Sequence, residues 1–452
     1  MTLYLNKDTI CAISSGGGMS AIALIRLSGD KSINVINKIF SKKINPEDSH
    51  SVHFGIIKEN NNILDEVVVT VFAKNKSFTR EETVEISCHG SEFIQKKILE
   101  LLITQGVRIA NPGEFTMRAF QNGKIDLSQA ESIADLIESD HHASHKNAIQ
   151  QLRGGFKKKL ENLRTNLIDF ASLIELELDF SEEDVEFANR DKLKELLTNI
   201  KYEVTNLITS FKLGNVIKNG IPVAIIGSPN VGKSTLLNTL LNDEKAIVSD
   251  IAGTTRDAIE DELIIEGQKF RFIDTAGLRE TNDKIEKIGI KKSIQKVSES
   301  KIIIHLIDGT KNINEQIKNI DNLNFNNNEI VIRVINKEDL NGENIIEDND
   351  YLHISALKNT GIDKLKNKLI SFYKSQKSSN NDTIITNVRH YNELKNTLTE
   401  INAIIEGLKN NTSSDFLTIN IRQALFHLGS ITGEVNTDDL LANIFGKFCI
   451  GK

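Results

Sequence analysis

Residues 221–241 read IPVAIIGSPNVGKSTLLNTLL, and this stretch decides the fold of the middle of the chain. The apolar run PVAIIG precedes a loop from Gly227 to Ser234 that fits G-x-x-x-x-G-K-S, and the helical pattern STLLNTLL follows. Between a strand and a helix, such a loop turns backbone N–H groups toward phosphates, with Lys233 at the β- and γ-phosphates and Ser234 on magnesium. The stretch therefore predicts a nucleotide-binding loop that opens an α/β domain.

Further strand-like runs alternate with helical segments up to about Tyr373: FRFIDT, KIIIHLID, EIVIRVIN and YLHISA. This alternation is typical of a parallel sheet. In FRFIDTAG, Asp274 follows a strand, where a carboxylate holds magnesium through water, and the backbone of Gly277 can contact the γ-phosphate. The segment IVSDIAGTTRD offers the hydroxyls of Thr254 and Thr255 for a switch loop ordered by magnesium and γ-phosphate.

The next strand is followed by a base-selective pattern. IRVINKED supplies Asn336, Lys337 and Asp339, and a carboxylate there accepts the ring N–H and exocyclic amine of guanine, which selects GTP over ATP. HISAL then places Ser355 and Ala356 where a loop can meet the guanine carbonyl. Four motifs in this order, each at a strand end, predict a GTPase.

The regions on either side of this domain have different patterns. Residues 1–120 mix β-rich runs (AIALIRLSG, ILDEVVVTVFA, ETVEISCHG) with the helical FIQKKILELLITQG and predict an α+β domain. Three amphipathic segments follow, SQAESIADLIESDHHASHKNAIQQL, KKKLENLRTNLIDFASLIELEL and DKLKELLTNIKYEVTNLITSF, and two similar ones come after the linker-like KSQKSSNNDT. We expect an α/β domain inserted into a discontinuous all-α domain, with boundaries at 1–120, 121–215, 216–377 and 378–452.

Composition narrows the class of protein. A chain of 452 residues suggests about three domains of ~150 residues each. The formal net charge of -7 argues against nonspecific wrapping of nucleic acid, so contact with RNA would use a local patch or a partner. Three widely spaced cysteines argue against a disulfide framework and fit a reducing cytoplasm. Neither a signal peptide nor an apolar run of ~20 residues is visible, so we expect a cytoplasmic protein with no membrane contact.

The hydrolytic machinery departs from the Ras pattern. Leu278 follows Asp274-Thr-Ala-Gly277, where Ras-type enzymes have a glutamine that orients the attacking water. Hydrolysis therefore needs other polarising groups, and a cation beside the phosphates could replace an arginine. Asn230 offers it a side-chain carbonyl oxygen, although the same residue suits a tight turn equally well.

Taken together, GSPNVGKSTLLN, DIAGTTRD, IDTAGLRE and NKED, with NPGEFTMRAFQNGKIDLSQAE and the final FCIGK, resemble the MnmE (TrmE) family of tRNA modification GTPases, of the TrmE-Era-EngA type. The resemblance covers essentially the whole chain. It implies a folate-binding, dimerising N-terminal domain, a discontinuous helical domain and a Ras-like G domain. It also implies a potassium-dependent enzyme that acts with the flavoprotein MnmG. Together they place an aminomethyl or carboxymethylaminomethyl group on carbon 5 of the wobble uridine of certain tRNAs, using a one-carbon unit from 5-formyltetrahydrofolate or a related folate.

The resemblance also assigns residues. Glu286 would orient the hydrolytic water, with Lys233 as the second catalytic residue. Mg²⁺ would be held by Ser234 and Thr255. K⁺ would be held by Asn230, Ser249, Ile251 and Thr254. Folate would be held by Arg26, Glu85, Lys124 and Lys452. GTP would be held by Asn230, Val231, Gly232, Lys233, Ser234, Thr235, Ser249, Asp250, Ile251, Ala252, Gly253, Thr254, Thr255, Asp274, Thr275, Ala276, Gly277, Asn336, Lys337, Asp339, Ser355, Ala356 and Leu357.

Some points stay open. Cys449 is a candidate for the chemistry, against a simple packing role for the tail. The segment Ser14–Ser20 lacks the proline and arginine usual in the family, which affects one edge of the folate pocket.

The partners implied are a second copy of the chain, MnmG in a heterotetramer, and tRNA. One alternative is a ribosome-assembly GTPase, which would need a KH-like module that the C-terminal third does not show. The other is a folate-dependent one-carbon transferase with a regulatory G domain.

Overall fold

The computed structural model describes residues 8–60, 62–179, 190–242, 261–273, 300–321, 330–340, 350–376, 383–410, 412 and 414–451. The chain divides into two compact units. One unit comprises Met1–Glu138, Ala148–Lys201 and Glu393–Lys452, and the other comprises Ser139–Asn147 and Tyr202–Asn392. The first therefore contains the predicted α+β region with most of the helical region, and the second contains the predicted G region.

The N-terminal region is built on a six-stranded sheet in the order β3-β4-β5-β2-β1-β6. Neighbouring strands are antiparallel except β1 and β6. Apolar residues of α1 and α2, among them Ile36, Ile98 and Leu102, pack with sheet residues in one buried core. The elements are β1 (Ile10–Ile13), β2 (Ile22–Ser28), α1 (Ser32–Ile39), β3 (Ser51–Glu59), β4 (Asn62–Phe72), β5 (Thr83–His89), α2 (Glu92–Thr104), β6 (Arg108–Ile109) and α3 (Glu114–Gln121).

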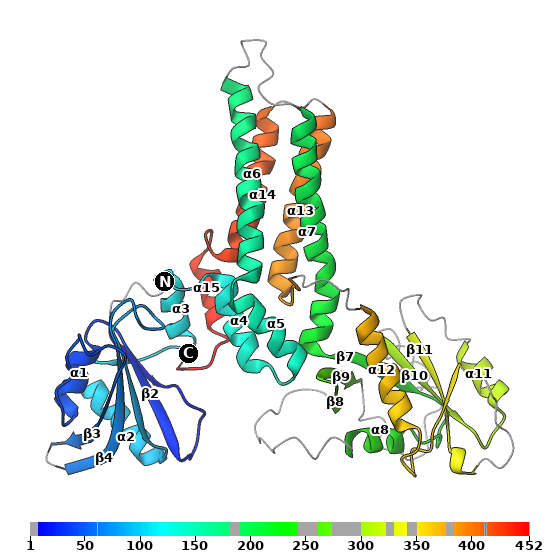
Figure 1. Cartoon of the computed structure of the whole chain (residues 1–452), viewed down its shortest axis with the longest axis horizontal. Helices are drawn as coiled ribbons and strands as arrows, with labels where there is room; N and C mark the ends of the chain where they lie inside the picture. Colours follow the sequence, from blue (N-terminus) through cyan, green and yellow to red (C-terminus); the bar gives the residue numbers. More distant parts are fainter. Residues whose placement is uncertain are drawn as a thin grey trace. The chain divides into compact units, whose positions relative to one another are not determined.

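Helices from both sides of the α/β region form one bundle. Phe170 of α6, Leu197 of α7, Ile404 of α13 and Ile421 of α14 share a buried core, and Figure 1 shows α6 beside α14. The predicted insertion is therefore confirmed at the level of packing, because segments more than 200 residues apart pack together. The helices are α4 (Leu127–Glu138), α5 (His142–Leu152), α6 (Gly155–Asp179), α7 (Arg190–Asn219), α13 (Val388–Lys409), α14 (Ser414–Thr432) and α15 (Asp438–Phe445).

The α/β region has a second six-stranded sheet, in the order β12-β11-β10-β7-β9-β8. All pairs are parallel except β8–β9. Leu237 of α8 and Leu369 of α12 pack with one set of strand residues, whereas Ile313 of α11 packs with Ile307 and Ile335. The elements are β7 (Ile221–Ile226), α8 (Lys233–Asn242), β8 (Asp261–Ile265), β9 (Gln268–Phe272), β10 (Ile302–Asp308), α11 (Ile313–Asp321), β11 (Ile330–Asn336), the 3-10 turn η1 (Glu338–Leu340), β12 (Tyr351–His353) and α12 (Ile362–Gln376).

The structure confirms the predicted fold class: an α+β N-terminal region, a discontinuous helical region and an inserted α/β region. One expectation about an element was wrong. The pattern over residues 128–152 suggested one long helix, but α4 ends at Glu138 and α5 begins at His142. Within the described parts of the chain, no helix combines the length and the apolar character that a membrane span requires.

Candidate functional site

The phosphate-loop candidate lies between β7, which ends at Ile226, and α8, which begins at Lys233. Two close approaches explain its glycines. A Cβ on Gly227 would lie 2.3 Å from the carbonyl oxygen of Leu306, and a Cβ on Gly232, whose φ is +103°, would lie 2.4 Å from Nδ2 of Asn336. Neither position accepts a side chain without displacement of its neighbour. The loop is therefore shaped by contacts with β10 and with the last residue of β11.

The polar groups of this loop face one another. The Lys233 ammonium donates to the carbonyl oxygens of Gly227 and Ser228, each at 2.9 Å, so its side chain folds over the loop. Ser234 and Thr235 lie in the first turn of α8, where the backbone N–H groups of a helix N-terminus and the positive end of the helix dipole favour anions. Asn230 is exposed and has a left-handed φ of +60°, a conformation that asparagine tolerates better than most residues. The arrangement suits a polyphosphate.

Asn336 joins the phosphate loop to the loop after β12. Its Nδ2 donates to the carbonyl oxygen of Val231 at 2.8 Å, and its Oδ1 accepts from the backbone N–H of Ala356 at 2.9 Å. The side chain of Thr239, on α8, donates to the carbonyl oxygen of Ala356 at 2.8 Å. Both Asn336 bonds are buried and the Thr239 bond is partly buried, so the three segments are fixed relative to one another.

Asp339 lies in η1, beside that junction. Ser355 Oγ donates to its Oδ1 at 2.6 Å, and the ammonium of Lys358 is 4.0 Å from its Oδ2. The hydrogen bond from Ser355 and, to a smaller extent, the charge of Lys358 lower the pKa of the Asp339 carboxyl. The carboxylate is therefore ionised and can accept two N–H groups from one edge of a purine. Leu357, the last predicted contact, is exposed on the same loop.

A second cluster in the N-terminal sheet contains two of the four predicted folate residues. Arg26 on β2 lies directly opposite Glu85 on β5, and its Nε donates to Glu85 Oε1 at 2.8 Å. The rings of Phe78 and Phe115 lie 6.0 and 5.7 Å from the Arg26 guanidinium carbon, within the range of cation–π contacts. Both charged side chains are about one-fifth exposed. Lys124 is exposed just beyond α3.

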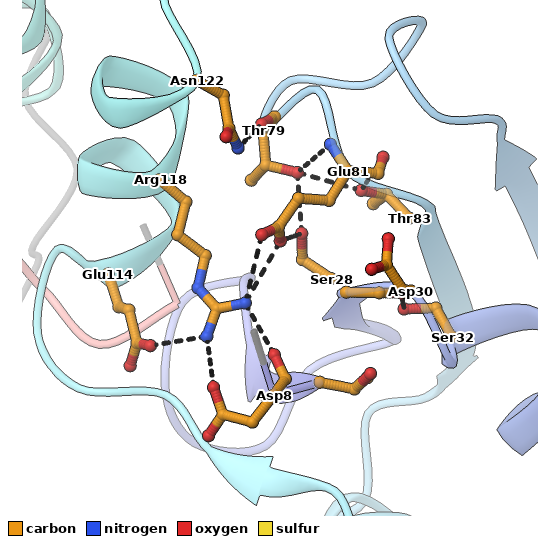
Figure 2. Close-up of polar contacts among 12 residues, drawn as sticks. Asp8, Ser28, Asp30, Ser32, Thr79, Glu81, Thr83, Glu114, Arg118 and Asn122 are labelled. Atoms are coloured by element: carbon orange, nitrogen blue, oxygen red, sulfur yellow. Dashed lines mark hydrogen bonds and ion pairs between the residues drawn. The ribbon is translucent and has the colours of Figure 1, made fainter. Parts of the chain in front are cut away.

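A buried ion network, which sequence reasoning missed, holds α3 in place (Figure 2). Arg118 is 4% exposed and donates to Asp8, Glu81 and Glu114. Burial alone would raise the pKa of Glu114, but hydrogen bonds from Arg108, Asn111 and Arg118 outweigh it and lower the pKa. The network ties α3 to the segment after Phe78, so it fixes the distance between the two rings that face Arg26.

The C-terminal tail lies against this part of the N-terminal region. Gly113 donates its N–H to the carbonyl oxygen of Cys449 at 3.3 Å, and Ser14 Oγ donates to the carbonyl oxygen of Gly451 at 2.9 Å. Cys449 is exposed, whereas burial raises the pKa of Cys11 to about 12 and that of Cys88 to about 11. Of the three thiols, Cys449 is therefore the one that solution reagents can reach.

The remaining predicted residues lie outside the described residues, so their positions stay predictions. They are Ser249, Asp250, Ile251, Ala252, Gly253, Thr254, Thr255, Asp274, Thr275, Ala276, Gly277, Glu286 and Lys452.

Comparison with known proteins places this geometry in a family. A model described as the GTP-binding protein TrmE N-terminus matches residues 9–124, and one described as the MnmE helical domain matches residues 127–449. The chain is 52% identical to the tRNA modification GTPase MnmE of Cytophaga hutchinsonii over 458 residues, which covers 100% of this chain and 99% of the relative. It is 51% identical to the protein of the same name from Flavobacterium johnsoniae over 470 residues, which covers 99% of this chain and 100% of that one.

Among solved structures, the chain is similar to Era in complex with MgGDPNP and nucleotides 1506–1542 of 16S ribosomal RNA. The two sequences are 28% identical, the match covers 40% of this chain and 66% of the Era chain, and the TM-score is 0.25. The family assignment rests on the models and the full-length relatives. The chain belongs to the MnmE (TrmE) family of tRNA modification GTPases.

Proposed function

We propose that this chain hydrolyses GTP, with potassium as a required cation, to control the modification of carbon 5 of wobble uridines in tRNA. The partner in that reaction would be the flavoprotein MnmG, and the one-carbon unit would come from a folate. The observation that carries the proposal is the junction at Asn336, which connects the phosphate loop at Val231 to the loop of Ala356, beside the ionised Asp339. These contacts bring the Gly227–Ser234 loop close to the segment of Asp339 at one end of one sheet, which supports the proposal that the loop binds phosphates and the carboxylate selects the purine.

The donor types agree with the proposed cations. Mg²⁺ would take the Ser234 hydroxyl with that of Thr255, and K⁺ would take the Asn230 side-chain oxygen with Ser249, Ile251 and Thr254. Hard cations prefer oxygen ligands, and the described members of both sets supply oxygen. When bound, K⁺ would supply positive charge beside the phosphates, which suits a chain with Leu278 in place of the Ras glutamine. Glu286 would orient the water.

The Arg26–Glu85 pair agrees with a folate. A carboxylate can bind the amino-pyrimidine edge of a pterin through two hydrogen bonds, and a guanidinium can bind a carboxylate. Lys124 and Lys452 would add positive charge for the glutamate tail. Cys449, exposed at the tail, would be available for chemistry at that end. We also propose that the protein forms a homodimer and that this dimer joins MnmG in a heterotetramer.

The first experiment measures modified nucleosides in total tRNA by mass spectrometry after deletion of the gene. Loss of aminomethyl-type wobble uridines, restored by the wild-type gene but not by Lys233→Ala, is expected. Intact uridines together with accumulating ribosome precursors would instead indicate a ribosome-assembly GTPase.

The second experiment compares GTP hydrolysis by the purified full-length protein in potassium and in sodium at equal ionic strength. We expect a strong decrease in sodium. Equal rates in the two salts would remove the cation from the mechanism, and folate binding that persists without potassium-dependent hydrolysis would favour a one-carbon transferase.

A further inference from the structure

Asp308, at the end of β10, is a buried acid outside every predicted motif. Its side chain is 1% exposed, and its Oδ2 accepts a hydrogen bond from the Lys337 ammonium at 2.8 Å. Its Oδ1 accepts from the Thr310 hydroxyl at 2.6 Å and from the Thr310 N–H at 3.0 Å. Both carboxylate oxygens are therefore occupied, and Lys337 neutralises a charge that would be costly to bury alone.

The backbone of Asp308 is held as firmly as its side chain. Gln316 of α11 accepts from the Asp308 N–H at 2.9 Å and donates to the Asp308 carbonyl oxygen at 3.0 Å. The next residue, Gly309, donates its N–H to the carbonyl oxygen of Asn336 at 3.0 Å. The carboxylate is thus a fixed point, anchored by α11 and by the neighbouring strand.

Lys337 needs such a fixed point. Its φ of +67° lies in the left-handed region, which costs energy for a residue with a side chain and persists only where the surroundings hold it. It stands between Asn336, which binds the phosphate loop, and Asp339, the proposed guanine carboxylate. A change in the backbone position of Lys337 would therefore move Asn336 and Asp339 as well.

We propose that Asp308 is a positioning residue for nucleotide binding, which acts by holding Lys337 and, through it, the Asn336–Asp339 segment in the geometry that binds guanine nucleotides. The proposal rests on the nucleotide site proposed above. Asp308 does not touch the nucleotide. Its effect on affinity passes through the ammonium of Lys337.

A double-mutant cycle on the full-length protein tests this route. The dissociation constant for a fluorescent GDP analogue is measured for the wild type, Asp308→Asn, Lys337→Met and the variant that combines both changes. Asp363→Asn, which removes an exposed carboxylate at the start of α12, is the matched charge control. Thermal unfolding of each nucleotide-free variant shows whether it is folded, and Lys233→Ala reports on the site itself.

We expect Asp308→Asn to raise the dissociation constant at least about tenfold, as close buried charge pairs do when one partner is lost. In the Lys337→Met background the same change should have almost no further effect. An equal loss in both backgrounds would show that Asp308 supports the fold without acting through Lys337, and an unchanged constant in Asp308→Asn would also overturn the proposal. Wild-type affinity in both Lys233→Ala and Lys337→Met would overturn the nucleotide site, and the role of Asp308 with it.

Discussion

We propose that base selection depends on a single ionised side chain. Asp339 accepts a hydrogen bond from Ser355 on one oxygen, and its carboxylate can accept the two N–H groups that guanine presents and adenine does not. Asn336 lies three residues before Asp339. Its side chain holds the phosphate loop rather than the base, because its Nδ2 and Oδ1 already have backbone partners. Selectivity and loop geometry are thus assigned to different residues of one short segment.

Replacing Asp339 by Asn should exchange guanine for xanthine selectivity. The amide offers an N–H where the carboxylate accepted one, which opposes the guanine amine and suits the second carbonyl of xanthine. We expect the affinity for GDP to fall by about 100-fold, as for a site whose polar group is left wrongly paired, while the affinity for XDP rises. Competition binding with the two diphosphates measures this, and Asp363→Asn serves as control. Unchanged preference would remove Asp339 from base recognition.

The sequence predicted the residues whose pattern is local and missed those whose role depends on distant partners. Lys233 and Asp339 occur in short motifs at strand ends, so spacing alone indicated them. Asp308 also ends a strand, in KIIIHLIDG, but its proposed role depends on its ion pair with Lys337, 29 residues later. Arg118 was likewise invisible, because its partner Asp8 is 110 residues away in the chain.

At the scale of elements, α3 is positioned by charge as well as by apolar packing. Arg118 and Glu114 are one turn apart and nearly buried, so their ion pair is screened little by solvent. Phe115, between them in sequence, presents its ring to Arg26. The helix therefore connects a structural network to a candidate binding residue.

Arg118→Met should destabilise the N-terminal region by about 3 kcal/mol, because Asp8, Glu81 and Glu114 would lose the buried guanidinium that they share, even though Glu114 keeps its hydrogen bonds with Arg108. Urea unfolding measures the change, with the exposed Arg153→Met as the matched control. The pKa of Glu114 is lower in the folded state than in the unfolded state. The ionised carboxylate therefore stabilises the fold fully at pH values above its unfolded-state pKa, and this stabilisation is lost as the pH falls through its folded-state pKa. The difference between wild type and variant should therefore shrink in acid. A difference that is constant down to acid pH would contradict the ionic origin.

The break between α4 and α5 shows why element boundaries were harder to predict. The amphipathic pattern continues through residues 139–141, but Asp140 forms an ion pair with Lys269, and His141 makes a hydrogen bond with the carbonyl oxygen of Ile217 at 2.9 Å. Both partners lie far along the chain, so helical periodicity could not reveal them. The strands β1, β3, β6 and β8 were missed for a related reason: they are short or lie at an edge of their sheet, so their pairing with neighbours, rather than a sequence pattern, defines them.

At the scale of the whole molecule, the two candidate sites fall in different compact units. Every described residue of the proposed nucleotide site, from Asn230 to Leu357, lies in the unit that includes Tyr202–Asn392. Arg26, Glu85 and the C-terminal tail lie in the other. A chain of this organisation can bind two ligands with separable determinants, and coupling between them then has to be measured rather than assumed.

Deletion of residues 448–452 tests that separation. The deletion removes Lys452 and the contacts of Cys449 with Gly113 and of Gly451 with Ser14, so we expect binding of 5-formyltetrahydrofolate to be lost. The dissociation constant for GDP should stay within about twofold, because the two proposed sites share no residues and sites without shared partners usually act independently. Isothermal titration with each ligand measures both.

The variants Lys452→Ala and Cys449→Ser assign the effect of the deletion. If the tail binds folate through the side-chain ammonium of Lys452, Lys452→Ala alone should reproduce most of the loss of folate binding. Cys449→Ser keeps the backbone carbonyl that accepts from the Gly113 N–H, so this variant should bind folate like the wild type. Folate binding that survives the deletion would place the folate site elsewhere in the chain. A large loss of GDP affinity on deletion would show instead that the tail couples the two units, because the tail and the described residues of the proposed nucleotide site belong to different units.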